Sequence, residues 1–178
     1  NHWDPGHLRS MMALVPQEPV LFSGTLRNNI FPDPDRVDEA TVNRIIASSN
    51  CSRLVERLPQ GIDTPLAKGG AGLSSGERQL VAIARALARE PELILLDEAT
   101  SYIDSQTEAV IHQALQNLMA GRTSIIVAHR LSTARGADQI IAMQHGRVKE
   151  SGTHATWMAS QGLYWRLNRQ SQDTIDRN

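Results

Sequence analysis

The second half of the chain alternates short apolar runs with longer stretches of helical spacing. Apolar runs at residues 93–96, 123–128 and 139–143 have the length of strands. Residues 105–119 and 131–135, between those runs, have the spacing of helices. A continuous apolar run such as 93–96 is typical of a strand that is covered on both faces of a parallel sheet. The alternation therefore predicts an α/β fold with a mostly parallel sheet and flanking helices.

Proline divides the first half of the chain into shorter elements. Residues 11–15 form an apolar run that Pro16 stops, which predicts a buried strand followed by a loop. Residues 25–30 predict a short helix with Thr25 as its cap. Residues 37–58 have helical apolar spacing.

A glycine-rich segment at residues 68–76 precedes the strongest helical pattern, which ends at Pro91. One face of that helix is apolar and holds Leu80, Ile83, Ala84 and Leu87. Glycine and serine before a helix leave backbone N–H groups available at the positive end of the helix dipole, where anions bind. A flexible loop ending in a helix cap is the alternative for this segment taken alone.

The C-terminal region continues with a turn and a tail. His145 and Gly146 predict a turn, after which residues 147–149 pair back as a hairpin. Residues 153–170 predict one or two amphipathic helices.

Composition and charge exclude several classes of protein. The 178 residues include 18 basic and 19 acidic side chains, so no excess of positive charge favours a nucleic acid partner. The apolar runs have strand length, well short of the roughly 18 residues of a membrane span. Cys51 cannot form an internal disulfide, and we expect it to be a small buried residue. Because the chain starts at Asn1, in a turn-like segment and without an initiator methionine, we expect it to be a fragment.

Two adjacent carboxylates end the apolar run at 93–96. In open α/β sheets, ligands lie at the carboxyl ends of the strands. Asp97 there can hold Mg²⁺ on a nucleotide, and Glu98 can polarise a water molecule. An acidic surface loop is the alternative for this pair alone. His129 ends the next apolar strand, so the three side chains are expected at one edge of the sheet.

Five motifs in one order resemble the ATP-binding cassette of ABC transporters, and the resemblance covers nearly the whole chain. VPQEPVLFSGTLRNNI resembles the glutamine loop, LSSGERQ the signature motif and LILLDEATS the Walker B motif with its following glutamate. SYID matches the position of the D-loop, and IIVAHRLST resembles the histidine switch. The sequence of the glutamine loop resembles that of exporters whose membrane helices are fused ahead of the ATPase.

The resemblance implies catalytic roles for four residues. Gln17 would contact Mg²⁺ or the attacking water and report to the membrane domain. Asp97 would hold Mg²⁺ through water, and Glu98 would be the general base or water-orienting group. His129 would contact the γ-phosphate of ATP.

The resemblance also implies contacts across a dimer. Ser74 and the backbone of Gly76, in the signature motif with Ser75 and Glu77, would contact the γ-phosphate of ATP bound to the opposite subunit. Asp104 would lie at the seam of that head-to-tail dimer.

Three regions follow from this assignment. Residues 1–30 would be a remnant of the nucleotide-binding core with the glutamine loop. Residues 31–90 would be a helical subdomain that carries the signature motif and docks on the membrane domain. Residues 91–178 would be the α/β core with Walker B, D-loop and histidine switch. The fold expected is that of an incomplete P-loop NTPase.

The Walker A motif is missing from the sequence. That motif reads G-x-x-x-x-G-K-[ST] and its lysine neutralises the phosphates, but neither lysine, Lys68 or Lys149, stands in such a context. In the family the motif precedes the glutamine loop, so we expect it upstream of Asn1, and we expect the fragment alone to be inactive.

Several residues of this sequence differ from those usual in the family, and the differences affect how strongly the signature motif would bind the phosphate. Ser75 stands where glycine is usual, and serine would cost roughly 1 kcal/mol if that position needs a positive φ. Glu77 stands where glutamine is usual and brings a negative charge near a phosphate site. Tyr102 and Ile103 replace other residues in the D-loop.

The function expected is ATP hydrolysis that powers export, at the cytoplasmic face of a membrane, with ATP and Mg²⁺. The expected partners are a membrane domain and a second nucleotide-binding domain, with no nucleic acid. A non-transport ABC ATPase acting on nucleic acid or ribosomes is the alternative. A binding or structural remnant without catalysis is the third reading and suits the isolated fragment.

Overall fold

The computed structural model describes residues 4–97, 105–128, 134–160, 162 and 164–166. The chain forms two compact units, residues 1–127 and 128–178. The predicted 31–90 subdomain lies within the first unit, and its boundaries stay a prediction.

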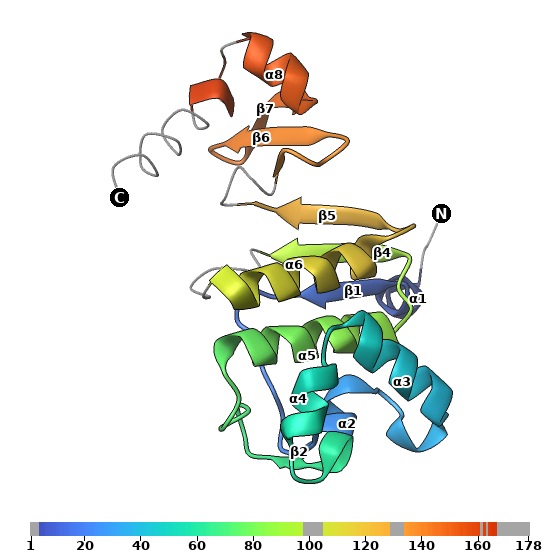
Figure 1. Ribbon diagram of the computed structural model, residues 1–178. Helices are drawn as coiled ribbons and strands as arrows, with labels where there is room; N and C mark the ends of the chain where they lie inside the picture. The colour runs from blue at the N-terminus through green and yellow to red at the C-terminus, as the bar shows by residue number, and fades with distance from the viewer. Residues whose placement is uncertain (1–3, 98–104, 129–133, 161, 163, 167–178) are drawn as a thin grey trace. The chain divides into compact units, whose positions relative to one another are not determined.

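A three-stranded parallel sheet organises the first unit (Figure 1). Its central strand is β4 (Leu93–Asp97), with β1 (Met12–Val15) on one side and β5 (Thr123–Val127) on the other. Val15 pairs with Leu96, and Asp97 pairs with Val127, so the three strands end at one edge. The predicted α/β fold with a parallel sheet is confirmed.

The two faces of this sheet differ in burial. Ala13, Val15, Ile94 and Leu96 are buried and share a core with α5 (Ser75–Ala88) and α6 (Ser105–Met119). On the other face Leu14, Ile125 and Val127 are 58%, 54% and 52% exposed. For the run at 93–96, Ile94 and Leu96 are buried on one face, whereas Leu93 and Leu95 on the other face are partly buried, so coverage of both faces is met only in part.

The remaining elements of the first unit are short. They are α1 (Pro5–Ser10), β2 (Gly24–Thr25), α2 (Leu26–Ile30), η1 (Pro34–Arg36), α3 (Glu39–Ser48), α4 (Ser52–Arg57), η2 (Gly61–Asp63) and β3 (Pro65–Leu66). Thr25 caps α2 by accepting a hydrogen bond from the Asn28 backbone, as predicted. The helical stretch predicted at 37–58 is instead two helices, because Asn50 takes a positive φ of 57° between them.

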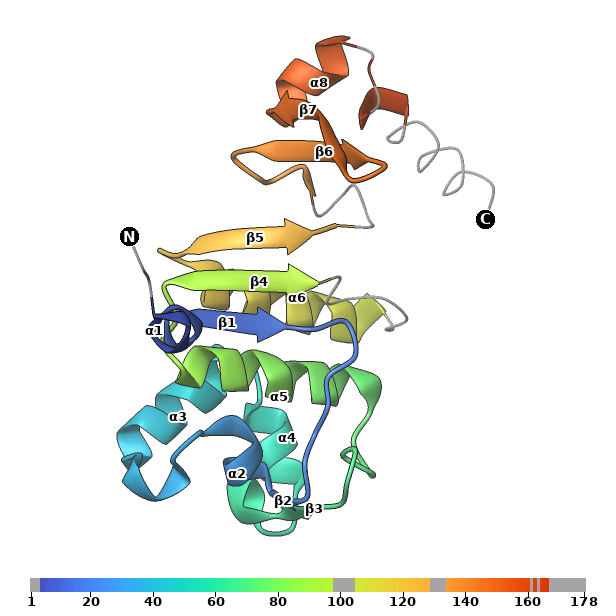
Figure 2. The same ribbon diagram turned by 180° about the vertical axis from the view of Figure 1, so that it is seen from behind.

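Helix α5 runs antiparallel to the strands (Figures 1 and 2). Near its N-terminus, Gln79 Nε2 donates to Pro16 O, just past the end of β1. Beyond its C-terminus, Arg89 Nη2 donates to Arg9 O, before β1 begins. The helix stops before Pro91, where Glu90 has a φ of 48°. The first turn of α5 therefore lies toward the carboxyl edge of the sheet.

The second unit is a hairpin with a helix. β6 (Ile140–Gln144) pairs antiparallel with β7 (Arg147–Gly152) through a turn in which His145 and Gly146 both have positive φ. The hairpin is longer than the predicted 147–149 return strand, and α8 (His154–Ser160) follows it. Of the helix predicted at 131–135, residues 131–133 lie outside the described residues. None of the helices described is long and apolar enough to cross a membrane.

Candidate nucleotide site

The carboxyl edge of the sheet collects the predicted catalytic residues that the structure describes. Asp97 is the exposed last residue of the central strand. Gln17 is exposed and follows the end of the neighbouring strand β1 by two residues. Glu98 and His129, which follow β4 and β5 in sequence, lie outside the described residues, as does Asp104.

The chemistry of Asp97 suits a magnesium nucleotide better than a metal cage. Within the described parts of the chain, no three His, Cys, Asp or Glu side chains come together as a metal site. Mg²⁺ on a nucleotide keeps several water ligands and needs only one or two protein carboxylates besides the phosphates. An exposed carboxylate at the end of a parallel strand therefore fits Mg²⁺ that arrives with its nucleotide.

The signature segment, residues 73–79, forms the start of α5 through a capping box. Ser74 is the N-cap, and its Oγ accepts a hydrogen bond from Glu77 N at 3.2 Å. In return, Ser74 N donates to Glu77 Oε2 at 2.8 Å. Ser74 and Ser75 are exposed. The box fixes the first turn and leaves both hydroxyls facing solvent.

This turn accommodates Ser75, which departs from the family pattern, and it depends on the glycine at position 76. Ser75 is the first residue of α5 and is not among the positive-φ residues, so the strain considered for it does not arise. Gly76 is buried against α6, and a Cβ there would collide with Thr107 Cγ2. Its lack of a side chain therefore permits the close approach of α5 and α6.

Glu77 forms an ion pair with Arg57, which offsets much of its negative charge near the proposed phosphate site. Arg57 Nη2, at the end of α4, lies 2.7 Å from Glu77 Oε1. Burial opposes ionisation of Glu77, but the hydrogen bond from Ser74 and the Arg57 guanidinium outweigh it and lower the pKa of Glu77. The negative charge at the signature segment thus has a cation beside it.

The segment after Gln17 is held by a buried asparagine. Asn29 is 3% exposed. Its Nδ2 donates to Phe22 O at 2.9 Å and to Thr25 O at 3.0 Å, and its Oδ1 accepts from Phe22 N at 2.8 Å. The side chain thereby satisfies both backbone groups of Phe22, as a neighbouring strand would.

Helix α5 holds the same segment through Arg85. Its guanidinium donates to Asn29 O at 2.7 Å, to Val20 O at 3.1 Å and to Asn29 Oδ1 at 3.2 Å. It also lies over the Phe22 ring, 5.5 Å from the centroid. Gly70, in the glycine-rich segment, packs on Leu21, where a Cβ would come within 2.6 Å of Cδ1. The signature helix and the glutamine-loop segment are thus hydrogen-bonded to each other.

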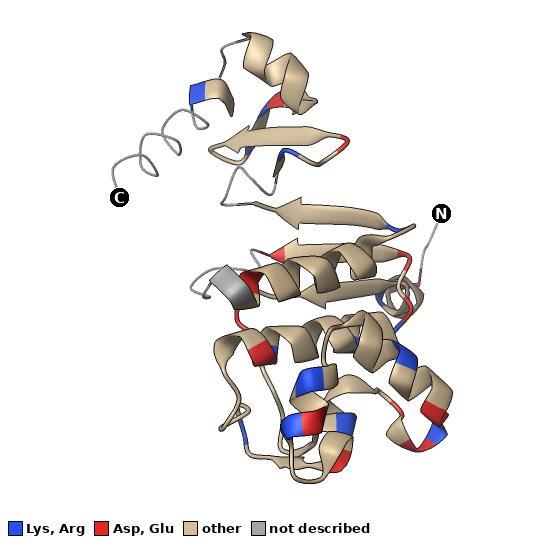
Figure 3. Cartoon of the chain, in the orientation of Figure 1, with Lys and Arg blue, Asp and Glu red and all other residues tan. Residues whose placement is uncertain are grey.

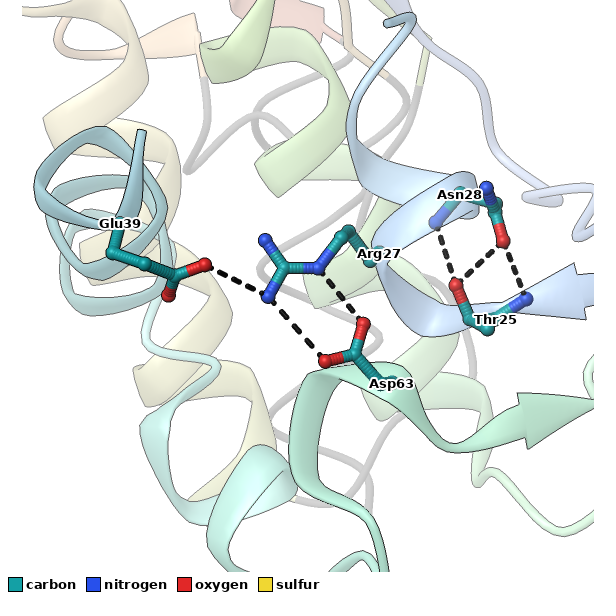
Figure 4. A network of polar contacts seen from close by, with 5 residues as sticks. All are labelled: Thr25, Arg27, Asn28, Glu39 and Asp63. Atoms are coloured by element: carbon teal, nitrogen blue, oxygen red, sulfur yellow. Dashed lines mark hydrogen bonds and ion pairs between the residues drawn. The ribbon is translucent and has the colours of Figure 1, made fainter. Parts of the chain in front are cut away.

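A second polar network ties α2 to its neighbours (Figure 4). Arg27 pairs with Asp63 at 2.8 Å and with Glu39 at 3.1 Å. Basic and acidic positions are interspersed along the helices around this network, which hold Arg27, Glu39, Arg44, Arg53, Glu56 and Arg57 (coloured by charge in Figure 3). This pattern is typical of a solvated surface rather than a basic face.

Sequence reasoning missed the residues that support the site. No role was predicted for Arg57 and Arg85, which lie outside the motif segments, or for Asn29 and Gln79, which lie inside them. Asn29 and Gln79 are buried polar residues. Their position in the sequence could have indicated this, because each is a polar residue on the apolar side of an amphipathic helix.

The parallel sheet, the carboxylate at its carboxyl edge and the capped helix beside it define an α/β nucleotide-binding domain of P-loop NTPase type. The chain belongs to the ABC transporter family, whose model, described as "ABC transporter", matches residues 1–101.

Relatives with transport functions support this membership. The chain is 46% identical over 160 residues, 90% of its length, to the probable multidrug resistance ABC transporter ATP-binding/permease protein YheH of Bacillus subtilis. It is 42% identical over 165 residues, 91% of its length, to the ATP-dependent lipid A-core flippase of Cupriavidus pinatubonensis.

A solved structure of a bacterial Atm1-family ABC exporter with ATP bound is similar to 92% of the chain, with a TM-score of 0.82 and 37% identity. The chain spans 24% of the first relative, 28% of the second and 28% of the exporter chain.

Proposed function

We propose that this chain is most of the ATP-hydrolysing domain of an ABC exporter, and that the complete protein couples MgATP hydrolysis to transport across a membrane. The observation that carries the proposal is the carboxyl edge of the sheet, where Asp97 ends the central strand and Gln17 follows its neighbour. The names of the relatives, a multidrug ATP-binding/permease protein and a lipid A-core flippase, support export over action on nucleic acid or ribosomes.

The chemistry is divided among four side chains. Asp97 would hold Mg²⁺, and the ion would supply charge neutralisation for the phosphates when it is bound. Glu98 orients or deprotonates the attacking water. His129 donates to the γ-phosphate, and Gln17 contacts the metal or the water.

The other half of each site comes from a second subunit. Ser74, with its hydroxyl exposed at the N-terminus of α5, donates to the γ-phosphate of ATP on the opposite subunit, together with the backbone of Gly76, in the signature segment that also holds Ser75 and Glu77. Asp104 lies at the seam of this head-to-tail dimer. ATP then holds the dimer closed, and hydrolysis releases it.

The membrane domain is the remaining partner. Val20 and Phe22, three and five residues after Gln17, are 61% and 63% exposed, although Arg85 and Asn29 hold their backbone by hydrogen bonds. A rigid segment with exposed apolar side chains suits a contact that reports nucleotide state to the membrane domain. In the proposed complex the domain lies at the cytoplasmic face of the membrane.

Substitutions at the sheet edge test the catalytic assignment in the complete protein. Glu98→Gln keeps size and hydrogen bonding but removes the charge, so hydrolysis should fall by about 10²–10⁴-fold, the range for one general acid–base group, with ATP binding near normal. His129→Ala should behave similarly, whereas Asp97→Asn should weaken Mg²⁺-dependent binding. Retention of most of the turnover by Glu98→Gln would refute the assignment.

A mixed dimer tests sharing between subunits. One subunit carries Ser74→Arg and the other a substitution of its Walker A lysine. Under trans sharing both defects fall on one composite site, and the second site still occludes ATP in single-turnover assays. If that site cannot occlude ATP while a dimer with both changes in one subunit can, the trans assignment fails.

The 178-residue chain alone should not turn over ATP. It has no Walker A lysine to neutralise the phosphates. Turnover by the purified chain that disappears in Glu98→Gln would contradict this expectation.

A further inference from the structure

The carboxylate of Glu77 lies where it would oppose a phosphate. It accepts a hydrogen bond from Ser74 N at 2.8 Å. Its negative charge therefore lies next to the residue that is proposed to bind the γ-phosphate. A helix N-terminus carries only about half a positive charge. A full negative charge beside it would reverse the sign of the local field and repel an anion.

Arg57 supplies the balancing charge from another helix. Its Nη2 lies 2.7 Å from Glu77 Oε1, while Glu77 Oε2 accepts from Ser74 N. Each carboxylate oxygen therefore has its own donor, and the carboxylate is held in one orientation. With the guanidinium in place, the turn keeps the positive character of a helix N-terminus.

The capping box also directs the Ser74 hydroxyl. Because Ser74 Oγ accepts from Glu77 N at 3.2 Å, its own hydrogen is left to donate outward. Ser74 is exposed, so the donor faces solvent. The Glu77 carboxylate thus sets the charge of this turn, and the Glu77 backbone N–H directs the Ser74 hydroxyl.

We propose that Arg57 is a positioning residue for the signature segment: it neutralises Glu77, so that the capped start of α5 can accept the γ-phosphate of ATP held by the opposite subunit. The inference rests on the proposed function and adds α4 to the composite site. Arg57 acts through Glu77 and does not contact the nucleotide.

The experiment measures the ATP concentration that gives half-maximal ATP occlusion by the complete transporter carrying Glu98→Gln. Arg57→Gln should raise that concentration about tenfold at low salt, because the unbalanced carboxylate repels the phosphates. The rise should shrink to about threefold or less in about 0.5 M NaCl, where exposed charges are screened. Arg57→Lys, which keeps a cation, should stay within about threefold of its parent.

The double variant Arg57→Gln/Glu77→Gln separates charge from structure. Glutamine at position 77 can still accept from Ser74 N while carrying no charge, so the double variant should recover most of the loss caused by Arg57→Gln. Arg44→Gln is the matched control, since Arg44 pairs with Glu90 at 2.9 Å with a side chain 53% exposed, against 54% for Arg57. It should not shift the ATP concentration.

The inference would be overturned by an Arg57→Gln variant within twofold of its parent, by a double variant as impaired as Arg57→Gln, or by a defect that persists unchanged in high salt. An Arg44→Gln shift as large as that of Arg57→Gln would do the same. Failure of the Glu98→Gln parent itself to occlude ATP would instead contradict the proposed function.

Discussion

Two arginines in the first unit have opposite surroundings. Arg85 donates to carbonyl and amide oxygens of Val20 and Asn29, and burial lowers the pKa of its guanidinium. Arg27 binds two carboxylates, those of Asp63 and Glu39, and the hydrogen bond to Asp63 raises its pKa against the cost of burial. One arginine is a multiple hydrogen-bond donor to backbone, and the other is part of an ion-pair network.

The two arginines differ in how well water can solvate their partners once the contact is lost. The partners of Arg85 include Asn29, which is buried, so loss of the contact leaves polar groups with little access to water. The carboxylates that pair with Arg27 are 58% and 71% exposed, and water can solvate them. The buried network should therefore determine stability and the shape of the glutamine-loop segment, whereas the exposed pairs should act mainly through local charge.

The largest effect should come from Asn29→Ala. This change removes three hydrogen bonds to backbone groups of Phe22 and Thr25 in a buried site, and we expect a loss of about 3 kcal/mol in the free energy of unfolding. Urea unfolding measures it. The control is Asn28→Ala, an exposed neighbour in the cap of α2, expected to cost about 1 kcal/mol. Equal losses for the two asparagines would contradict the comparison.

A second, smaller effect should come from Arg85→Lys. Lysine keeps the charge but has no planar fork to reach Val20 O, Asn29 O and Asn29 Oδ1 together. We expect a loss of about 1–2 kcal/mol in the same unfolding measurement. A lysine variant as stable as its parent would show that charge over the Phe22 ring, rather than hydrogen-bond geometry, holds this segment.

The contrast between these clusters also shows what sequence can predict. The sheet edge was predictable, because apolar runs ending at Pro16 and Asp97 locate strand ends, and parallel strands end together. The capped start of α5 was predictable from Ser74 and Glu77 at capping-box spacing. Both signals are local.

Contacts between distant elements were not predictable from one sequence. Arg57 and Glu77 are 20 residues apart, and Asn29 and Arg85 are 56 apart. Nothing in their local spacing indicates that they meet. The break at Asn50 was missed because a single residue with positive φ leaves the apolar spacing around it helical. The motif roles themselves came from resemblance, and the roles of Glu98, Asp104 and His129 stay predictions.

Arg27→Met should have a still smaller effect on stability. Methionine keeps most of the packing but removes the pairs with Asp63 and Glu39, so we expect a loss of about 0.5–1 kcal/mol. Unfolding in about 0.5 M NaCl should reduce this difference, because the two carboxylates that pair with Arg27 are exposed to salt. A loss as large as that of Asn29→Ala, unaffected by salt, would place Arg27 with the buried network instead.

The smallest effect should be the pH dependence that Glu77 contributes. Its folded-state pKa is lowered, since the Ser74 hydrogen bond and Arg57 outweigh burial, which opposes ionisation. The stability it supplies is therefore fully present above its unfolded pKa, near 4.3, and is lost as pH falls through the lower folded pKa. Glu77→Gln should remove a few tenths of a kcal/mol at pH 7 and nothing once the pH is below both values. The measurement is urea unfolding of both proteins between about pH 3 and pH 7. A difference that grows toward acid would have the wrong sign and would mean that Glu77 is not held as a paired carboxylate.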